Sequence, residues 1–174
     1  QHGVALEDEA SLASIAAALD LRFDQGRVWL AGEDASEAIR HEDVGVMASR
    51  ISALPAVRQA LLALQQHFRQ APGLVADGRD MGTTVFPEAA LKIYLTANAS
   101  QRAARRYKQL IDKGIPARLD SLRADLEARD LRDTGRAASP LKPAEDALLL
   151  DNSALTVDQS ADLVLDWWEQ RRPF

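Results

Sequence analysis

The sequence contains no cysteine, no long apolar run and no excess of positive charge, and each absence excludes a class of protein. Without cysteine, the chain can form neither disulfides nor thiolate metal sites, a composition compatible with a reducing cytoplasm. No apolar run approaches the length of a membrane-spanning helix. The formal net charge of −5 argues against nonspecific electrostatic binding to duplex nucleic acid over a broad surface. We therefore expect a cytoplasmic protein with no membrane or duplex nucleic-acid partner.

The motifs of several common enzyme classes are also missing. None of the three histidines has a partner at metal-ligand spacing or suggests a Ser-His-Asp arrangement, and we expect all three at the surface: His2, His41 and His67. A phosphate-cradling loop of the form G-x-x-x-x-G-K-[ST] is not found. Gly73 and Gly78 have its glycine spacing, but Arg79 and Asp80 stand where lysine and serine or threonine are required.

Helical and strand patterns alternate along the 174 residues, of which 47% are hydrophobic. Apolar residues at helical spacing predict helices at about 7–19, 42–53, 55–70, 100–113, 119–133 and from Thr156 onward, where Gln159 completes a capping box. Polar-apolar alternation around Gln25-Gly26 predicts a hairpin at 20–31. Short apolar runs predict buried strands at 74–77, 91–96 and 147–151. This order favours a single α/β domain with a parallel sheet flanked by helices.

The stretch from Gly73 to Pro87 is the most informative part of the chain. Its apolar run ends at Asp77, and the carboxyl ends of parallel strands are where such sheets place their ligand sites. An apolar strand ending in an acid is common and, taken alone, favours a helix cap or turn. The following Gly78-Arg79-Asp80 favours a ligand site, because glycine lets a ligand approach the backbone beside two opposite charges. The alternative is an Arg–Asp pair that ties a loop.

A second group of charges lies near the end of the 119–133 helix. Arg129, Asp133 and Arg136 are spaced by four and three residues, which puts them on one face if the helix continues that far. A solvated face with i,i+4 pairing is an equally good interpretation. Arg132 and Arg136 add positive charge beyond what the acids offset, which suits a mobile lid closing on phosphates.

The helix near 100–113 is basic on one side, with Arg102, Arg105 and Arg106. Taken alone, these arginines are best interpreted as surface charge on an otherwise acidic protein.

The residues Gly73 to Pro87, GLVADGRDMGTTVFP, closely resemble the central motif of bacterial cytidylate kinases. Further matching segments follow the order of that family along nearly the whole chain: Met47–Arg50, Pro55–Arg58, Lys92–Leu95, Arg102–Arg106, Arg129–Asp133 with Arg136, Pro140–Pro143 and Leu150-Asp151. The resemblance implies transfer of the γ-phosphoryl group of ATP to cytidine or deoxycytidine monophosphate. It also implies Mg²⁺ as cofactor and a monomer whose partners are small nucleotides.

The resemblance implies a role for each matching residue. The positions that read the cytosine edge are Ser49, Arg58 and Asp80, and those that contact the sugar hydroxyls are Arg129 and Asp133. The arginines near the monophosphate and the transferring group are Arg79 and Arg136, and the acid near Mg²⁺ is Asp77. The lid arginines are Arg102, Arg105, Arg106 and Arg132.

The resemblance also implies a division of one kinase domain over residues 1–174. Residues 1–72 match the monophosphate-binding region with a β insertion at about 20–34, residues 100–136 match the lid, and residues 73–99 and 137–174 match the core. The family places a phosphate loop and its strand before the position that matches Gln1. We therefore expect the P-loop nucleoside monophosphate kinase fold without that strand and loop, and an impaired ATP site in this chain alone.

Two other hypotheses remain open at this point. The chain could be a non-catalytic remnant that keeps the monophosphate pocket and binds a nucleotide without turnover. It could also be a structural or interaction domain whose charged helices are surface and bind nothing.

Overall fold

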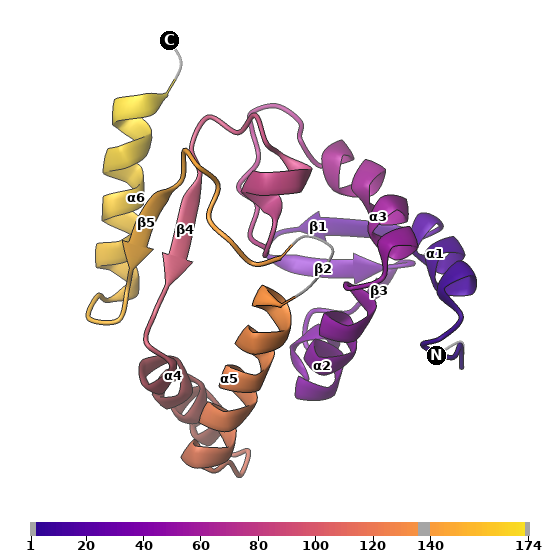
Figure 1. Ribbon diagram of the computed structural model, residues 1–174, viewed down its shortest axis with the longest axis horizontal. Helices are drawn as coiled ribbons and strands as arrows, with labels where there is room; N and C mark the ends of the chain where they lie inside the picture. Colours follow the sequence, from indigo (N-terminus) through magenta and orange to yellow (C-terminus); the bar gives the residue numbers. More distant parts are fainter. Residues whose placement is uncertain (1–2, 136–139, 173–174) are drawn as a thin grey trace. The chain divides into compact units, whose positions relative to one another are not determined.

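The computed structural model describes residues 3–135 and 140–172, and the chain divides into two compact units on either side of the bond between Ala76 and Asp77 (Figure 1). The first unit combines helices with a small antiparallel sheet. The second combines helices with two parallel strands. The chain is therefore of the α/β class, as the alternating patterns predict.

The helices of the first unit are α1 (Glu9–Ala17), η1 (Ala38–Arg40), α2 (Glu42–Ile51) and α3 (Pro55–His67). Pro55 occupies the first turn of α3, where its missing N–H costs nothing. The Glu9 side chain of α1 accepts a hydrogen bond from the Ala56 backbone N–H at 2.7 Å, so one helix caps the other. Ala16 and Val57 are buried where α1 packs against α3. The three α-helices predicted over this region are confirmed.

The sheet of the first unit consists of β1 (Leu21–Asp24), β2 (Arg27–Leu30) and β3 (Glu33–Asp34) in antiparallel order. Gln25 and Gly26 have φ values of 48° and 74°, the two positive angles of a type I′ turn, which matches the twist of a hairpin. The Phe23 ring meets the Phe68 ring edge-on with centroids 5.1 Å apart, joining the hairpin to the end of α3. The predicted hairpin is confirmed.

The second unit holds η2 (Met81–Val85), β4 (Ile93–Thr96), α4 (Ala99–Asp112), α5 (Leu119–Thr134), β5 (Leu148–Asp151) and α6 (Val157–Arg171). β4 and β5 lie side by side in parallel, with Ile93 opposite Leu148 (Figure 1). α4 packs against α5, and Ala103 of α4 is fully buried. The N-caps of α4 and α6 are Asn98 and Thr156, and the predicted capping box of Thr156 with Gln159 is confirmed.

The predicted buried strand at 74–77 is wrong. Residues 73–77 have no regular secondary structure, and Val75 is 100% exposed. A β-strand needs a neighbouring strand to satisfy its backbone N–H and C=O groups, and three apolar residues cannot supply one. Within the described residues, β4 pairs with β5 and neither pairs with this segment. Asp77 consequently begins a loop rather than ending a strand.

Candidate active site

The loop that starts at Asp77 ends in a tight π-type turn, η2, which is anchored by the backbone of Asp80. The Asp80 carbonyl accepts hydrogen bonds from the N–H groups of Thr84 at 2.9 Å and Val85 at 3.2 Å. Asp80 is itself only 6% exposed, and its side chain takes no part in capping η2. The Asp80 side chain is therefore buried beside the turn that its carbonyl closes, whereas Asp77 is exposed.

Gly78 lies directly under the Met81 side chain. A Cβ added at Gly78 would lie 3.0 Å from two atoms of that side chain, tighter than most real Cβ contacts. The methionine of the turn therefore covers the glycine directly. This close approach favours glycine between the two acids of the motif.

An ion cluster around Asp133 joins the loop to the last turn of α5. Asp133 is 1% exposed, and its Oδ2 accepts a hydrogen bond from Arg79 Nε at 2.9 Å. Arg129 Nε lies 3.9 Å from the same oxygen, one helical turn away. A carboxylate this deeply buried is tolerated only when cations and hydrogen bonds compensate for its lost hydration. The i,i+4 pair predicted for α5 is present, but on a buried face rather than a solvated one.

The predicted lid arginines Arg102 and Arg105 bind protein groups inside the second unit. Arg102 of α4 forms a two-pronged contact with Asp130 of α5, which raises the pKa of the guanidinium chiefly through the hydrogen bonds to that carboxylate. Arg105 donates to the Asn152 side-chain oxygen at 3.0 Å and to the Leu155 carbonyl at 3.4 Å, in the loop after β5. These contacts tie α4 to α5 and to the sheet.

The other lid arginines have different surroundings. Arg106 is half-buried on α4, whereas Arg132 is exposed in the last turn of α5. Arg136 lies outside the described residues, so its predicted place on the same face as Arg129 and Asp133 stays a prediction.

Ser49 and Arg58 lie in the first unit and are linked through Ser52. Ser49 is buried near the end of α2, and its carbonyl accepts a hydrogen bond from the Ser52 hydroxyl at 3.1 Å. Arg58 of α3 donates from Nη1 to the Ser52 carbonyl at 3.1 Å. The junction between α2 and α3 therefore brings these two predicted residues close together. The structure thus forms two local groups, Ser49 with Arg58 and Arg79 with Arg129 and Asp133.

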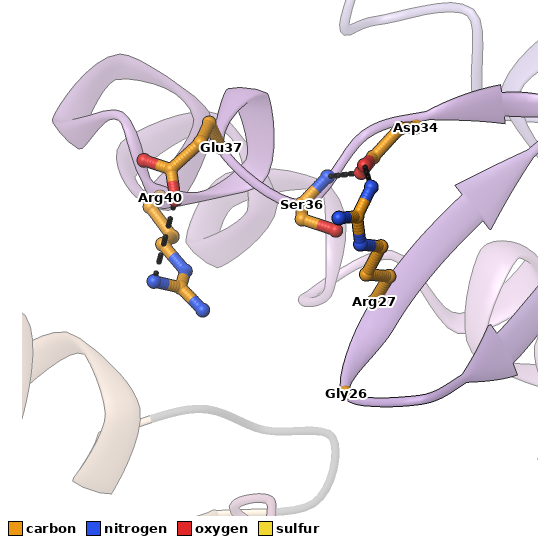
Figure 2. Close-up of a pocket in the computed structure, with 6 residues that line it drawn as sticks. All are labelled: Gly26, Arg27, Asp34, Ser36, Glu37 and Arg40. Carbon is orange, nitrogen blue, oxygen red and sulfur yellow. Dashed lines mark hydrogen bonds and ion pairs between the residues drawn. The ribbon is translucent and has the colours of Figure 1, made fainter.

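Two pockets lie away from these groups. One of about 510 Å³ lies beside the hairpin, lined by Gly26, Arg27, Asp34, Ser36, Glu37 and Arg40 (Figure 2). The second, of about 340 Å³, lies beside η2 and is lined in part by Gly82, Thr83, Lys92 and Asp146. No role was predicted for Lys92, Asp146 or Asp130, because each contacts a partner distant in the chain.

The described residues form neither a three-residue metal cluster nor a membrane-crossing helix. Across residues 3–135 and 140–172, no group of three or more His, Asp or Glu side chains is arranged to hold a metal ion. No helix in the described part of the chain combines the length and apolar character needed to cross a membrane.

Comparison with known proteins gives one consistent family. The family model described as cytidylate kinase matches residues 1–170. A cytidylate kinase of Cupriavidus necator is 57% identical over 171 residues, which cover 98% of this chain and 77% of that protein. One of Bordetella bronchiseptica is 58% identical over 168 residues, covering 97% and 75%. One of Ralstonia pickettii is 60% identical over 163 residues, covering 94% and 71%.

Proposed function

The chain belongs to the cytidylate kinase family, and from that premise we propose that it provides the acceptor site for transfer of the ATP γ-phosphoryl group to cytidine or deoxycytidine monophosphate. The observation that carries this proposal is the ion cluster in which Arg79 contacts Asp133, 54 residues away. It brings together two residues to which the sequence resemblance gives phosphate and sugar roles. Phosphoryl transfer needs such positioning and charge neutralisation rather than a covalent intermediate.

Asp80 reads the base, and the sequence resemblance gives the same role to Ser49 and Arg58 of the first unit. A carboxylate accepts hydrogen bonds only, so it pairs with the exocyclic amine of cytosine and repels the carbonyl that uracil carries there. The burial of Asp80 supports this role, because a charge with little access to water strongly disfavours a mismatched partner. Discrimination against uridine monophosphate follows from this repulsion.

The sugar and phosphate are held by the cluster on α5. Asp133 and Arg129 contact the sugar hydroxyls, and Arg79 and Arg136 contact the monophosphate and the transferring group. The Arg79 side chain is 41% exposed, and only its Nε is engaged by Asp133. Its two terminal nitrogens are then directed by the carboxylate and can donate to phosphate oxygens, the geometry for which arginine is suited.

The α4–α5 pair acts as the lid. Arg132 is exposed and therefore the lid arginine best suited to contact phosphates directly. Arg102 holds α4 against α5, and Arg105 holds α4 against the loop after β5. Both therefore contribute to phosphate binding indirectly, by keeping the lid helices in place. Arg106 adds positive charge on α4, the helix that also carries Arg102 and Arg105.

ATP is the co-substrate, and the divalent metal that accompanies it is Mg²⁺. Asp77 is an exposed carboxylate at the start of the loop, and one carboxylate with nucleotide phosphates is a typical environment for Mg²⁺. The bound ion would neutralise negative charge on the transferring group. Asp77 would orient the ion, and with it the transferring phosphoryl group, relative to Arg79. We further propose a cytoplasmic monomer.

The test is a coupled ADP-release assay on the full-length protein with cytidine, deoxycytidine and uridine monophosphates. We expect kcat/KM for cytidine monophosphate to exceed that for uridine monophosphate by at least about 100-fold, as expected when a buried polar group rejects a mismatched partner. Equal values would overturn the proposal.

A second candidate function for these 174 residues taken alone is binding without turnover. The observation in its favour is the lack of a G-x-x-x-x-G-K-[ST] loop in the printed sequence. Titration calorimetry distinguishes the two functions, because heat of binding with no ADP release supports the second candidate. If substitution of Asp80 and Arg136 changes the binding of no nucleotide, both candidates fail and a purely structural domain remains.

A further inference from the structure

Lys92 immediately precedes β4 and has an unusual environment for a lysine. Its side chain is only 9% exposed, and its Nζ lies within 3.0 Å of both carboxylate oxygens of Asp146, two residues before β5. The Lys92 carbonyl accepts a hydrogen bond from the Leu148 N–H at 2.9 Å. The pKa of Asp146 is lowered, first of all by the hydrogen bond from Lys92. Lys92 therefore ties the starts of the two parallel strands through both its backbone and its side chain.

The buried stem of Lys92 runs directly over Gly82 in η2. A Cβ placed on Gly82 would lie 3.3 Å from both Cγ and Cδ of Lys92. This separation is tighter than most real Cβ contacts, so the lysine stem would have to shift by a few tenths of an ångström to admit a larger residue. The ion pair of its amine with Asp146 restrains that shift. Lys92 thus sets how far η2 can approach the sheet.

The turn that Lys92 covers is the same turn that positions Asp80. The Asp80 carbonyl accepts from the N–H groups of Thr83, Thr84 and Val85, so Gly82 lies inside the hydrogen-bonded ring that Asp80 closes. Lys92 and Gly82 also line the pocket of about 340 Å³ beside η2. If the stem were shortened, the turn could relax into this open space and carry the Asp80 backbone with it.

We propose that Lys92 is a positioning residue for base recognition: anchored by Asp146, it presses on Gly82 and so fixes the turn that orients Asp80. The inference rests on the proposed function of Asp80 as the group that reads cytosine. Lys92 does not touch the nucleotide. Its effect is to hold the carboxylate where the exocyclic amine arrives, and a displacement of about 1 Å at such a group can cost up to about 100-fold in rate.

The test measures kcat/KM for cytidine and uridine monophosphates, with ATP in excess, in the full-length protein and its variants. Lys92→Ala removes the stem, and we expect the preference for cytidine to fall about tenfold through a higher KM for cytidine monophosphate. Lys92→Met keeps most of the stem but loses the anchor to Asp146, so the preference should fall by about threefold, less than in Lys92→Ala. A general loss of structure would lower kcat/KM for both nucleotides equally and would overturn the proposal.

Gly82→Ala provides an independent arm that keeps Lys92. The added methyl group meets the lysine stem in the wild-type background, so the preference for cytidine should fall by about threefold or more. In the Lys92→Ala background the same methyl group has room, and the two substitutions should therefore be clearly non-additive. Additive effects, or a Gly82→Ala protein with unchanged preference, would contradict the coupling.

Asp80→Asn separates this inference from the proposed function. If Asp80→Asn abolishes the preference for cytidine while Lys92→Ala and Gly82→Ala leave it unchanged, the positioning role fails and the base-reading role stands. If Asp80→Asn also leaves the preference unchanged, the proposed function itself fails. Melting curves of each variant exclude loss of folding as the cause.

Discussion

The hairpin of the first unit and the motif loop of the second unit both pair arginine with aspartate, but they hold these charges in different surroundings. At the hairpin, Arg27 donates to Asp34 at 3.1 Å, and both side chains are exposed beside a pocket of about 510 Å³ (Figure 2). At the motif loop, Arg79 donates to an Asp133 that is almost fully buried.

This difference suggests a criterion for the functional site: the burial of a charged side chain is a better indicator than the volume of a nearby pocket. An exposed ion pair contributes little free energy because water and salt screen it. A buried carboxylate is costly to maintain, so a protein that keeps one generally uses it in a specific arrangement. On this basis we propose that the hairpin pocket is a surface feature and that the loop with α5 belongs to the acceptor site. Asp34→Asn at the hairpin is the matched exposed change for the buried acids Asp80 and Asp133.

The largest expected effect is at Asp80. Asp80→Asn replaces a pure acceptor with an amide that can also donate, so kcat/KM for cytidine monophosphate should fall by about 100-fold or more and activity on uridine monophosphate should rise. The matched change Asp34→Asn at the hairpin should leave both values within about twofold. Steady-state kinetics with the two nucleotides measure this. Equal losses in the two variants would remove the distinction between the regions.

The next largest effect is at Asp133. Asp133→Ala leaves Arg129 and Arg79 without their shared carboxylate. We expect the free energy of unfolding to fall by about 3 kcal/mol, the lower end of the range for a broken buried ion pair, because Arg79 can turn to solvent. Catalytic efficiency should fall with it. Urea denaturation measures the stability, with Asp34→Asn as the exposed control. A stable Asp133→Ala protein would show that the cluster is not what holds the loop to α5.

A smaller effect is expected at the tip of the hairpin. Gly26 has φ of 74°, a left-handed conformation that alanine adopts at a cost of about 1 kcal/mol. Gly26→Ala should therefore lower the stability of the protein without changing its preference between cytidine and uridine monophosphates. A change in that preference would mean that the hairpin takes part in base recognition.

The smallest effect is the pH dependence of the hairpin. The pKa of Asp34 is lowered from its ordinary value of 3.8, mainly by the hydrogen bond from the Ser36 hydroxyl and then by that from the Ser36 backbone N–H. Because the folded pKa lies below the unfolded one, the stabilisation is fully present above pH 3.8 and is lost as the pH falls through the lower folded value. Asp34→Asn should lose less stability over this acidic range. Thermal melts of the two proteins below pH 5 would show the difference, and parallel pH curves would contradict it.

Local patterns in the sequence predicted most of the elements but few of the contacts between them. The apolar runs at β4 and β5 and the capping box of Thr156 with Gln159 are visible within a few residues, and all are confirmed. The π turn was missed because Met81–Val85 has no helical periodicity and depends on the carbonyl of Asp80. The segment around Val75 was misjudged because apolar composition alone does not supply a neighbouring strand.

The residues of the candidate site could be predicted from the sequence, but the contacts between them could not. The motif resemblance picked out Arg79 and Asp133 separately, but their contact joins positions 54 residues apart, and no spacing rule reaches that far. The same holds for Lys92 with Asp146 and for Arg102 with Asp130. For Asp133 the two interpretations of its helix, solvated face or binding face, differed only in burial, which a single sequence does not reveal.

The most direct test of the proposed acceptor site is titration calorimetry of this chain with cytidine monophosphate and with uridine monophosphate under identical conditions. Binding needs the acceptor site alone, so the result does not depend on transfer from ATP. The buried acids of the second unit predict that cytidine monophosphate binds at least about tenfold more tightly, a difference of about 1.4 kcal/mol. Equal affinities, or heat of binding from neither nucleotide, would contradict the claim that Asp80 and Asp133 form a cytidine monophosphate site.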